Sequence, residues 1–166
     1  MTNDSVQYRQ WIAQVATALG VPASLALRVA QQESGVQQYW QTGPRAGQLK
    51  LSPKGALGIM QVMPANGAGF DLRDPYGNIQ AGVRYLAEMY PRFDTWPLAA
   101  AAYNAGPGRV DEYIAGSKAL PLETRQYVAA VTGWGGVPGG MPAQTSPSRA
   151  LLAAGLLAAG LYVLLS

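Results

Sequence analysis

Three observations predict a mainly α-helical domain that is joined by a linker to a C-terminal transmembrane helix. Over residues 1–132, apolar residues recur at the three- and four-residue spacing of helices. No segment of any length there alternates apolar and polar residues as a half-buried strand does. Residues 133–148 are then rich in Gly and Pro, and residues 149–166 are almost entirely apolar. We therefore expect a helical domain, a linker and a membrane anchor with these boundaries.

The first two helices are expected over residues 5–19 and 22–34. Gly20 is suited to end the first helix, because glycine adopts the left-handed conformation found just beyond many helix ends. Pro22 is suited to the first position of the second helix, where the missing N–H has no partner to lose. The inward face of the first helix is predicted to hold Tyr8, Ile12, Val15 and Leu19.

The second helix places a carboxylic acid at the end of its own apolar row. Leu25, Val29 and Glu33 follow one another at i, i+4 spacing, with Ala26 and Ala30 beside them. Burial disfavours the charged form of a carboxyl, so the pKa of Glu33 should rise, as a general acid near neutral pH requires. A glutamate that only closes an amphipathic helix has the same spacing, and this stretch alone leaves both interpretations open. The opposite side of the helix should carry Ser24, Arg28 and Gln31.

Residues 37–54 are expected to be irregular, because glycine and proline interrupt a mostly polar stretch. The segment begins shortly after Glu33, so it is either a rim or lid loop over a site or a surface connection without a role. Residues 55–64 should form a short apolar helix or turn. A turn over residues 74–78 follows, with Asn78 as the expected helix cap.

The remaining helices are predicted after this turn and over residues 97–105, 109–115 and 122–132. Arg84 and Glu88 have the i, i+4 spacing of an ion pair on the exposed side of the first of them. Residues 97–105 are rich in alanine and should be buried. The inward face of the helix after the turn is predicted to hold Ile79, Gly82, Val83, Leu86 and Met89.

Composition excludes several classes of chemistry. The chain contains no His and no Cys, so it has no Ser-His-Asp triad, no thiol nucleophile and none of the usual zinc ligand sets. No metal and no cofactor is expected. The net charge of +3 suits an anionic polymer such as cell wall or a lipid surface, but no basic run indicates nucleic acid. Hydrolytic or lyase chemistry would depend on carboxylates, hydroxyls, amides or Lys.

Four stretches carry a resemblance to a known family. They are AQQESG, which contains Glu33 and Ser34, then SPKGALGIMQVMP at 52–64, AAYNAGPGRV at 101–110 and LPLETRQYV at 120–128. In this order they resemble the soluble-type lytic transglycosylases over about residues 8–132. The resemblance implies a lysozyme-like catalytic domain and does not extend to the linker or the apolar tail.

The resemblance also implies a reaction. Glu33 would be the single general acid/base that cleaves the β-1,4 bond between N-acetylmuramic acid and N-acetylglucosamine, with a 1,6-anhydro product and no water consumed. Asp71 and Asp74 are the runner-up partners for a two-acid hydrolase, although turn and helix-capping roles fit them better. The resemblance places Tyr103 near Glu33, where its hydroxyl would orient the carboxyl. The implied substrate-binding residues are Ser52, Gln61, Met63, Tyr103, Asn104 and Glu123.

Two features depart from the family pattern. Ile59 stands where the family usually has Leu, and the segment between Glu33 and Ser52 is longer than is typical. Two other functions stay open beside the lytic transglycosylase. One is a lysozyme-type hydrolase on the same fold, because a fold alone does not decide whether water is the nucleophile. The other is a non-catalytic glycan-binding or structural virion membrane protein.

The apolar run from Ala150 to Leu165 contains no charged residue and would be about 24 Å long as a helix. This is a short span for a hydrocarbon core of about 30 Å. We expect it to insert in a lipid bilayer, although a helix buried against the domain has the same composition. The N-terminus reads as polar, without a secretory signal. The sequence therefore favours a membrane-anchored phage enzyme, either held in a virion membrane or delivered during infection, that acts on the periplasmic cell wall.

Overall fold

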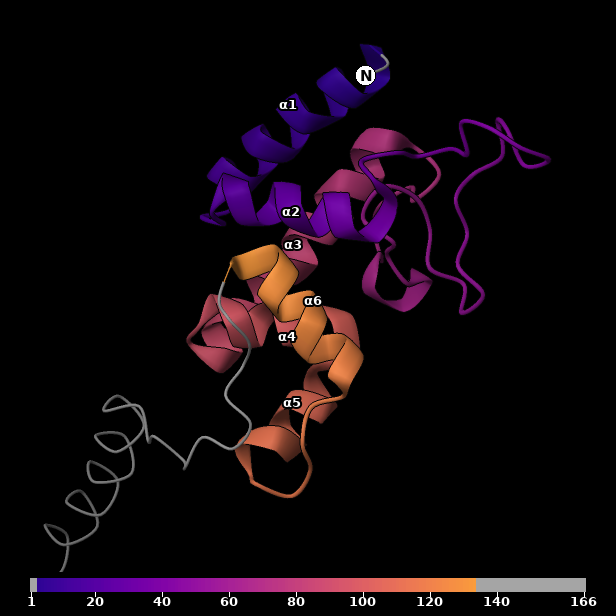
Figure 1. The fold of residues 1–166 in the computed structure, drawn as a ribbon. Helices are drawn as coiled ribbons and strands as arrows, with labels where there is room; N and C mark the ends of the chain where they lie inside the picture. Colours follow the sequence, from indigo (N-terminus) through magenta and orange to yellow (C-terminus); the bar gives the residue numbers. More distant parts are fainter. Residues whose placement is uncertain (1–2, 134–166) are drawn as a thin grey trace, which may run out of the picture.

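A computed structural model describes residues 3–133. Figure 1 shows helices α1 and α2 packed together on one side of the long helix α3, and helices α4, α5 and α6 on its other side. Helix α3 contacts α1 and α4, while α6 contacts both α4 and α2 and so closes the bundle. The elements are α1 (Asn3–Ala18), α2 (Ala23–Ser34), the 3-10 turn η1 (Pro64–Asn66), α3 (Pro75–Phe93), α4 (Trp96–Ala105), α5 (Pro107–Ile114) and α6 (Leu122–Thr132).

The mainly helical prediction is confirmed over the described residues. Pro22 lies one position before the first helical residue of α2, and Gly35 ends the helix in the left-handed conformation. Gly106 is the single residue between α4 and α5, because α4 ends at Ala105 and Pro107 already belongs to α5. The side chain of Leu19, predicted to point inward, is 44% exposed because α1 ends at Ala18.

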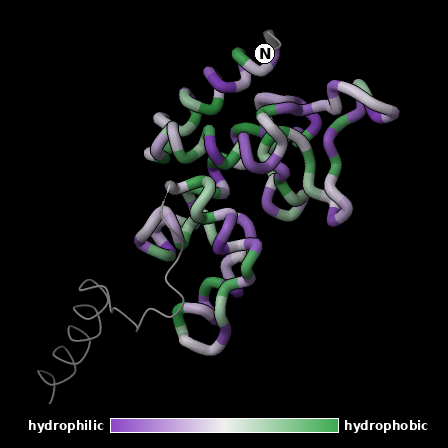
Figure 2. Tube along the Cα trace, in the orientation of Figure 1, coloured by the Kyte–Doolittle hydropathy of each residue, from purple (hydrophilic) through white to green (hydrophobic). Residues whose placement is uncertain are grey.

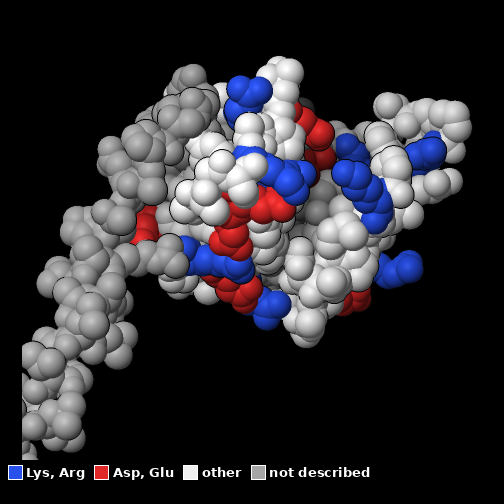
Figure 3. Space-filling view, turned by 90° about the horizontal axis from the view of Figure 1, so that it is seen from below, with Lys and Arg blue, Asp and Glu red and all other residues white. Residues whose placement is uncertain are grey.

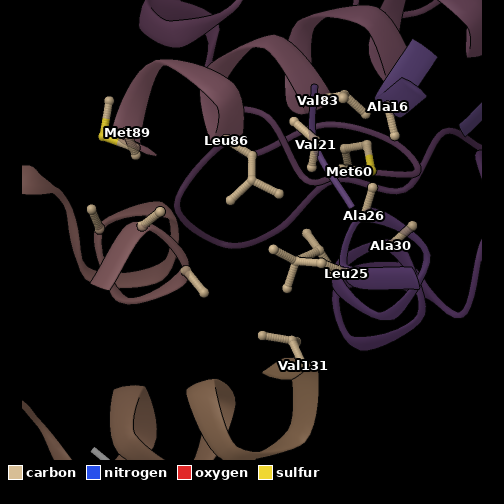
Figure 4. Packing of buried hydrophobic residues seen from close by; sticks show 14 of the residues in the cluster. Ala16, Val21, Leu25, Ala26, Ala30, Met60, Val83, Leu86, Met89 and Val131 are labelled. Carbon is tan, nitrogen blue, oxygen red and sulfur yellow. The ribbon is translucent and has the colours of Figure 1, made fainter. Parts of the chain in front are cut away.

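The apolar faces of the helices meet in one core. Figure 2 shows hydrophobic and hydrophilic residues succeeding one another along the helices, as expected for helices with one buried side. In Figure 4, Leu25 of α2, Leu86 of α3 and Val131 of α6 point into the same region. The alanine-rich α4 is buried as predicted, with Ala99, Ala100, Ala101 and Ala102 fully inaccessible to solvent. These small side chains let neighbouring helices approach closely.

The predicted helix cap at Asn78 is wrong. Asp74 caps α3, since its carboxylate accepts a hydrogen bond from the Gly77 N–H at 2.7 Å. Asn78 lies inside the helix, and its side chain is fully buried. The Arg84–Glu88 ion pair is present, at 3.4 Å.

The segment between α2 and α3 contains isolated bridges but no regular strand within the described part of the chain. Residues 38–50 form a hairpin loop, in which the Trp40 N–H donates to Gln48 O and the Gly47 N–H donates to Trp40 O. This hairpin loop projects from the helices in Figure 1. Residues 55–64 are turns paired at Leu57 and Val62, so the turn rather than the short helix is present there.

Among residues 3–133, no helix is both long enough and apolar enough to cross a bilayer. The predicted membrane anchor at 149–166 and almost all of the predicted linker at 133–148 lie outside the described residues.

Candidate active site

Glu33 lies in the last turn of α2, at the end of the row that Leu25 and Val29 begin. Both of those side chains are buried, while Glu33 is half-buried. Burial raises the pKa of the Glu33 carboxyl from 4.5 to about 7, although a hydrogen bond from Tyr127 opposes this rise. The carboxyl can therefore both hold and release a proton near neutral pH, as general acid/base catalysis requires.

Tyr127 on α6 contacts this carboxyl directly. Its hydroxyl donates a hydrogen bond to Glu33 Oε1 at 2.7 Å, and its side chain is 5% exposed. Burial and the nearby Glu33 carboxylate raise the pKa of Tyr127 well above its usual value, so the hydroxyl keeps its proton and remains a donor. The sequence analysis missed this role, although Tyr127 lies in the LPLETRQYV stretch.

Tyr103 on α4 lies close to the same carboxyl but bonds elsewhere. Its hydroxyl donates to the Met60 carbonyl at 2.6 Å, so the expected orientation of the carboxyl by Tyr103 is a role that Tyr127 takes instead. Burial, the Glu33 charge and Tyr85 raise the pKa of Tyr103 well above its usual value. A Cβ at Gly82 would overlap the Met60 side chain, so a glycine is needed where α3 packs against Met60.

Two buried amides, which the sequence analysis did not single out, hold the loop at residues 57–60. Gln38 Oε1 accepts from the Ile59 N–H at 2.9 Å, and Asn78 Oδ1 accepts from the Met60 N–H at 2.8 Å. Both side chains also donate to the Leu72 carbonyl. A Cβ at Gly58 would overlap both amides, and Gly58 has a φ of +71°. Nothing in the local sequence distinguishes these amides from surface polar residues.

Ser34 attaches the end of α2 to the same loop. Its hydroxyl donates to the Ile59 carbonyl at 2.7 Å and accepts from the Gln37 N–H at 3.0 Å. This buried contact explains why a serine follows the candidate acid. It fixes the relative positions of Glu33 and the loop.

The other predicted site residues lie around this centre. Gln61 has a φ of 47°, and its side-chain amide donates to the Gly58 carbonyl at 2.8 Å, so part of it is already engaged. The Ser52 hydroxyl accepts from the Ala56 N–H at 2.9 Å and shapes a turn. Met63 is 38% exposed, directly before η1. Asn104 is half-buried beside Tyr103 in α4, and Glu123 is exposed in the first turn of α6.

The contacts of the described residues connect Glu33 with Tyr127, and through charge with Tyr103, but give no contact from Glu33 to the other five predicted residues. The two runner-up acids have structural partners. Asp71 accepts from the Arg73 N–H at 2.9 Å, and Asp74 caps α3. Within residues 3–133 no three His, Cys, Asp or Glu side chains gather in a way that would hold a metal ion.

The geometry thus defines a helical domain with one partly desolvated glutamate near the buried Tyr127 and the half-buried Tyr103. The family model described as "Transglycosylase SLT domain" matches residues 10–125, and the chain belongs to this family, with its mainly helical, lysozyme-like fold.

Curated relatives carry the same domain. The chain is 35% identical over 136 residues to the soluble lytic murein transglycosylase of Escherichia coli K12, a match that covers 67% of this chain and 20% of the relative. It is 30% identical over 142 residues to the membrane-bound lytic murein transglycosylase D of the same organism, covering 73% and 29%. The chain therefore spans between a fifth and a third of the length of these relatives.

Solved structures agree with the fold. The 70 kDa soluble lytic transglycosylase of Escherichia coli superposes with a TM-score of 0.62 at 28% identity, over 86% of this chain and 26% of that one. An inactive mutant of the lytic transglycosylase Slt from Pseudomonas aeruginosa gives 0.61 at 29% identity, over 74% and 22%. A complex of the 70 kDa soluble lytic transglycosylase with bulgecin A gives a TM-score of 0.61 at 29% identity, over 82% of this chain and 26% of that one.

Proposed function

We propose that this chain is a peptidoglycan lytic transglycosylase in which Glu33 is the single general acid/base. One observation carries the proposal: the half-buried Glu33 carboxyl, with a pKa of about 7, accepts a hydrogen bond from a buried tyrosine in a domain of the transglycosylase SLT family. The chain has no His or Cys that would supply another acid/base or nucleophile. The printed names of the relatives support the reaction class.

In the proposed reaction the protonated Glu33 gives its proton to the glycosidic oxygen between the muramoyl and glucosaminyl residues, and the C1–O bond breaks. The Glu33 carboxylate then takes the proton of the muramoyl C6 hydroxyl, and that oxygen closes on C1. The products are a 1,6-anhydro-muramoyl end and a free C4 hydroxyl, and Glu33 returns to its protonated form. One carboxyl serves both steps because it releases a proton in the first step and takes up a proton in the second. The Tyr127 hydroxyl stabilises the carboxylate between them.

Ser52, Gln61, Met63, Tyr103, Asn104 and Glu123 are proposed to bind the glycan strand. Of these, Met63 and Glu123 have exposed side chains. Tyr103 instead contacts the loop at residues 57–60, through its hydrogen bond to the Met60 carbonyl. Apolar contact with sugar rings suits Met63, and hydroxyl or amide contact suits Ser52 and Gln61. The lysozyme-type hydrolase on the same fold remains the second candidate, because it would use the same acid.

Purified sacculi test the proposal. Wild-type protein should release fragments with anhydro-muramoyl ends, detected by mass spectrometry, and the rate should fall as the pH rises through about 7 because the carboxyl must begin protonated. Glu33→Gln should lower this rate about a thousandfold while retaining binding to sacculi. Products with reducing ends would establish the hydrolase instead. Unchanged lysis by the Glu33→Gln variant would remove Glu33 from its role, and sacculus binding without any lysis by the wild type would leave the non-catalytic binding protein.

We also propose that the apolar run at 150–165 anchors the enzyme to a lipid bilayer, and that the enzyme opens the wall locally during phage infection. The charge-free composition of the run supports the anchor. The phage role follows from joining a wall-cutting domain to a membrane segment, as a particle with a membrane would need. Flotation with lipid vesicles, compared with a chain that ends at residue 133, tests the anchor. Detection of the protein in purified phage particles tests the role, and its confinement to cellular envelopes would refute it.

A further inference from the structure

The stretch between the candidate acid and α3 has an unusual charge pattern. Between Glu33 and Asp71 the sequence contains Arg45, Lys50 and Lys54 but no Asp or Glu. Figure 3 shows Lys and Arg atoms on the side of the molecule from which the hairpin loop projects in Figure 1. The ion pairs of the described residues involve other cations, namely Arg84, Arg92, Arg109 and Lys118. No carboxylate among the described residues therefore forms an ion pair with Arg45, Lys50 or Lys54. The positive charge of the hairpin loop therefore remains available to a ligand.

Two of these cations share one aromatic ring. Lys50 Nζ lies 4.8 Å from the centre of the Trp40 ring, and Arg45 Cζ lies 6.0 Å from it. Lys50 Nζ also donates to the Ser34 carbonyl at 2.5 Å, directly beside the candidate acid. Partial burial lowers the pKa of Lys50. The Trp40 ring and the Ser34 carbonyl thus hold the positive charges of Arg45 and Lys50 near one another. Neither group carries a full negative charge, so an anion bound here would neutralise them further.

A pocket of about 620 Å³ opens beside this cluster. Trp40, Arg45 and Gln48 line it from the hairpin loop, and Leu51 and Ser52 line it from the segment that follows. The volume is in the range of sites that bind small ligands or short peptides. Ser52 belongs to the proposed glycan-binding set, so the pocket adjoins the path proposed for the glycan strand.

We propose that this pocket binds the acidic peptide that the muramoyl residue of the substrate carries, with Arg45 as the principal contact for a peptide carboxylate. The proposal rests on the proposed function, since it concerns the same substrate. A guanidinium matches a carboxylate in shape and charge, the Gln48 amide can pair with a peptide backbone, and Trp40 and Leu51 offer apolar surface to side-chain methylenes. Leu51 is 53% exposed, so its side chain is accessible to a ligand in the pocket.

The test compares glycan strands that carry their peptides with the same strands after an amidase has removed them. The measured quantity is the ratio of kcat/KM for anhydro-end release on the two substrates. Arg45→Gln should lower this ratio about threefold, and Arg45→Glu about tenfold, because a carboxylate at that position repels the peptide. Arg28→Glu makes the same charge change on the exposed side of α2 and is the matched control, which should leave the ratio unchanged. Strands whose peptide carboxylates are amidated should behave toward the wild type like the stripped strands.

A ratio that Arg45→Glu does not change, or that Arg28→Glu lowers equally, would overturn the proposal. The same holds if the amidated strands match the native ones. If the wild type releases no anhydro ends from either substrate, the proposed function itself fails, so the two failures are distinguishable. Arg45 is exposed and lies in a turn of the hairpin loop, so its variants should fold.

Discussion

The Glu33 site and the hairpin loop adjoin in space but are held in opposite ways. Around Glu33, the buried or half-buried side chains of Asn78 on α3, Tyr103 on α4 and Tyr127 on α6 make specific hydrogen bonds. Apart from the buried Gln38 at its start, the hairpin loop is mostly exposed and is held by its own backbone hydrogen bonds, by Tyr39 and by Lys50. Under the two proposals, the core would hold one proton-transfer group and the hairpin loop would present charge to a variable ligand. Each prediction below tests one side of this contrast.

The largest expected effect concerns the folding stability that the chain loses when the Glu33 carboxyl ionises. The pKa of Glu33 is about 7 in the folded chain and 4.5 as the unperturbed value. Between these values the folded state binds one more proton than the unfolded state, so the Glu33 contribution to stability is present below pH 4.5 and is lost as the pH rises to about 7. Glu33→Gln avoids this loss. Relative to the wild type it should gain up to about 3 kcal/mol between pH 4.5 and pH 8.

Urea unfolding at both pH values measures this difference. Glu88→Gln is the matched control, because Glu88 is exposed and its ion pair with Arg84 should contribute under about 0.5 kcal/mol. A Glu33→Gln variant whose advantage does not grow with pH would show that the carboxyl is well solvated.

The next effect concerns the buried amides. Asn78→Ala would leave the buried Met60 N–H without its acceptor and would remove one of the two N–H donors of the Leu57 carbonyl. We expect a loss of about 2 kcal/mol in the free energy of unfolding. Gln126→Ala, on the exposed side of α6, removes an amide of similar chemistry and should change stability by less than about 0.5 kcal/mol. Equal effects for the two variants would contradict the role assigned to Asn78.

A smaller effect follows from the tyrosine that contacts the acid. Tyr127→Phe removes the hydrogen bond that lowers the pKa of Glu33, so the carboxyl pKa should rise further and the alkaline limb of the rate profile should move to higher pH. The maximal rate should fall about tenfold, and stability by about 1 kcal/mol. Tyr90→Phe on the surface of α3 is the control. A profile that does not move would mean that Tyr127 has only a packing role.

Sequence reasoning predicted most helices and the candidate acid, because both depend on local spacing. The row of Leu25, Val29 and Glu33 needs only the helical repeat to be recognised. The choice of Tyr127 over Tyr103 as partner of Glu33 depends on how α6 packs against both α2 and α4, and no local pattern contains that information. The burial of Asn78 was missed for a related reason. Its position after Asp74 resembles that of a helix cap. Only the folded structure, in which residues 57–60 pack against α3, shows which groups its side-chain amide contacts.

The smallest effect tests whether the hairpin loop is independent of the core. Gly47 has a φ of +78°, and an alanine there is strained by about 1 kcal/mol. Because few contacts join the hairpin loop to the helices, this strain should favour local opening rather than global unfolding. The amides of Trp40 and Gly47 should then exchange their hydrogens about fivefold faster in Gly47→Ala, while amides of α3 and α4 remain unchanged. Faster exchange in α3 as well would show that the hairpin loop unfolds together with the core, and the contrast between the two regions would no longer hold.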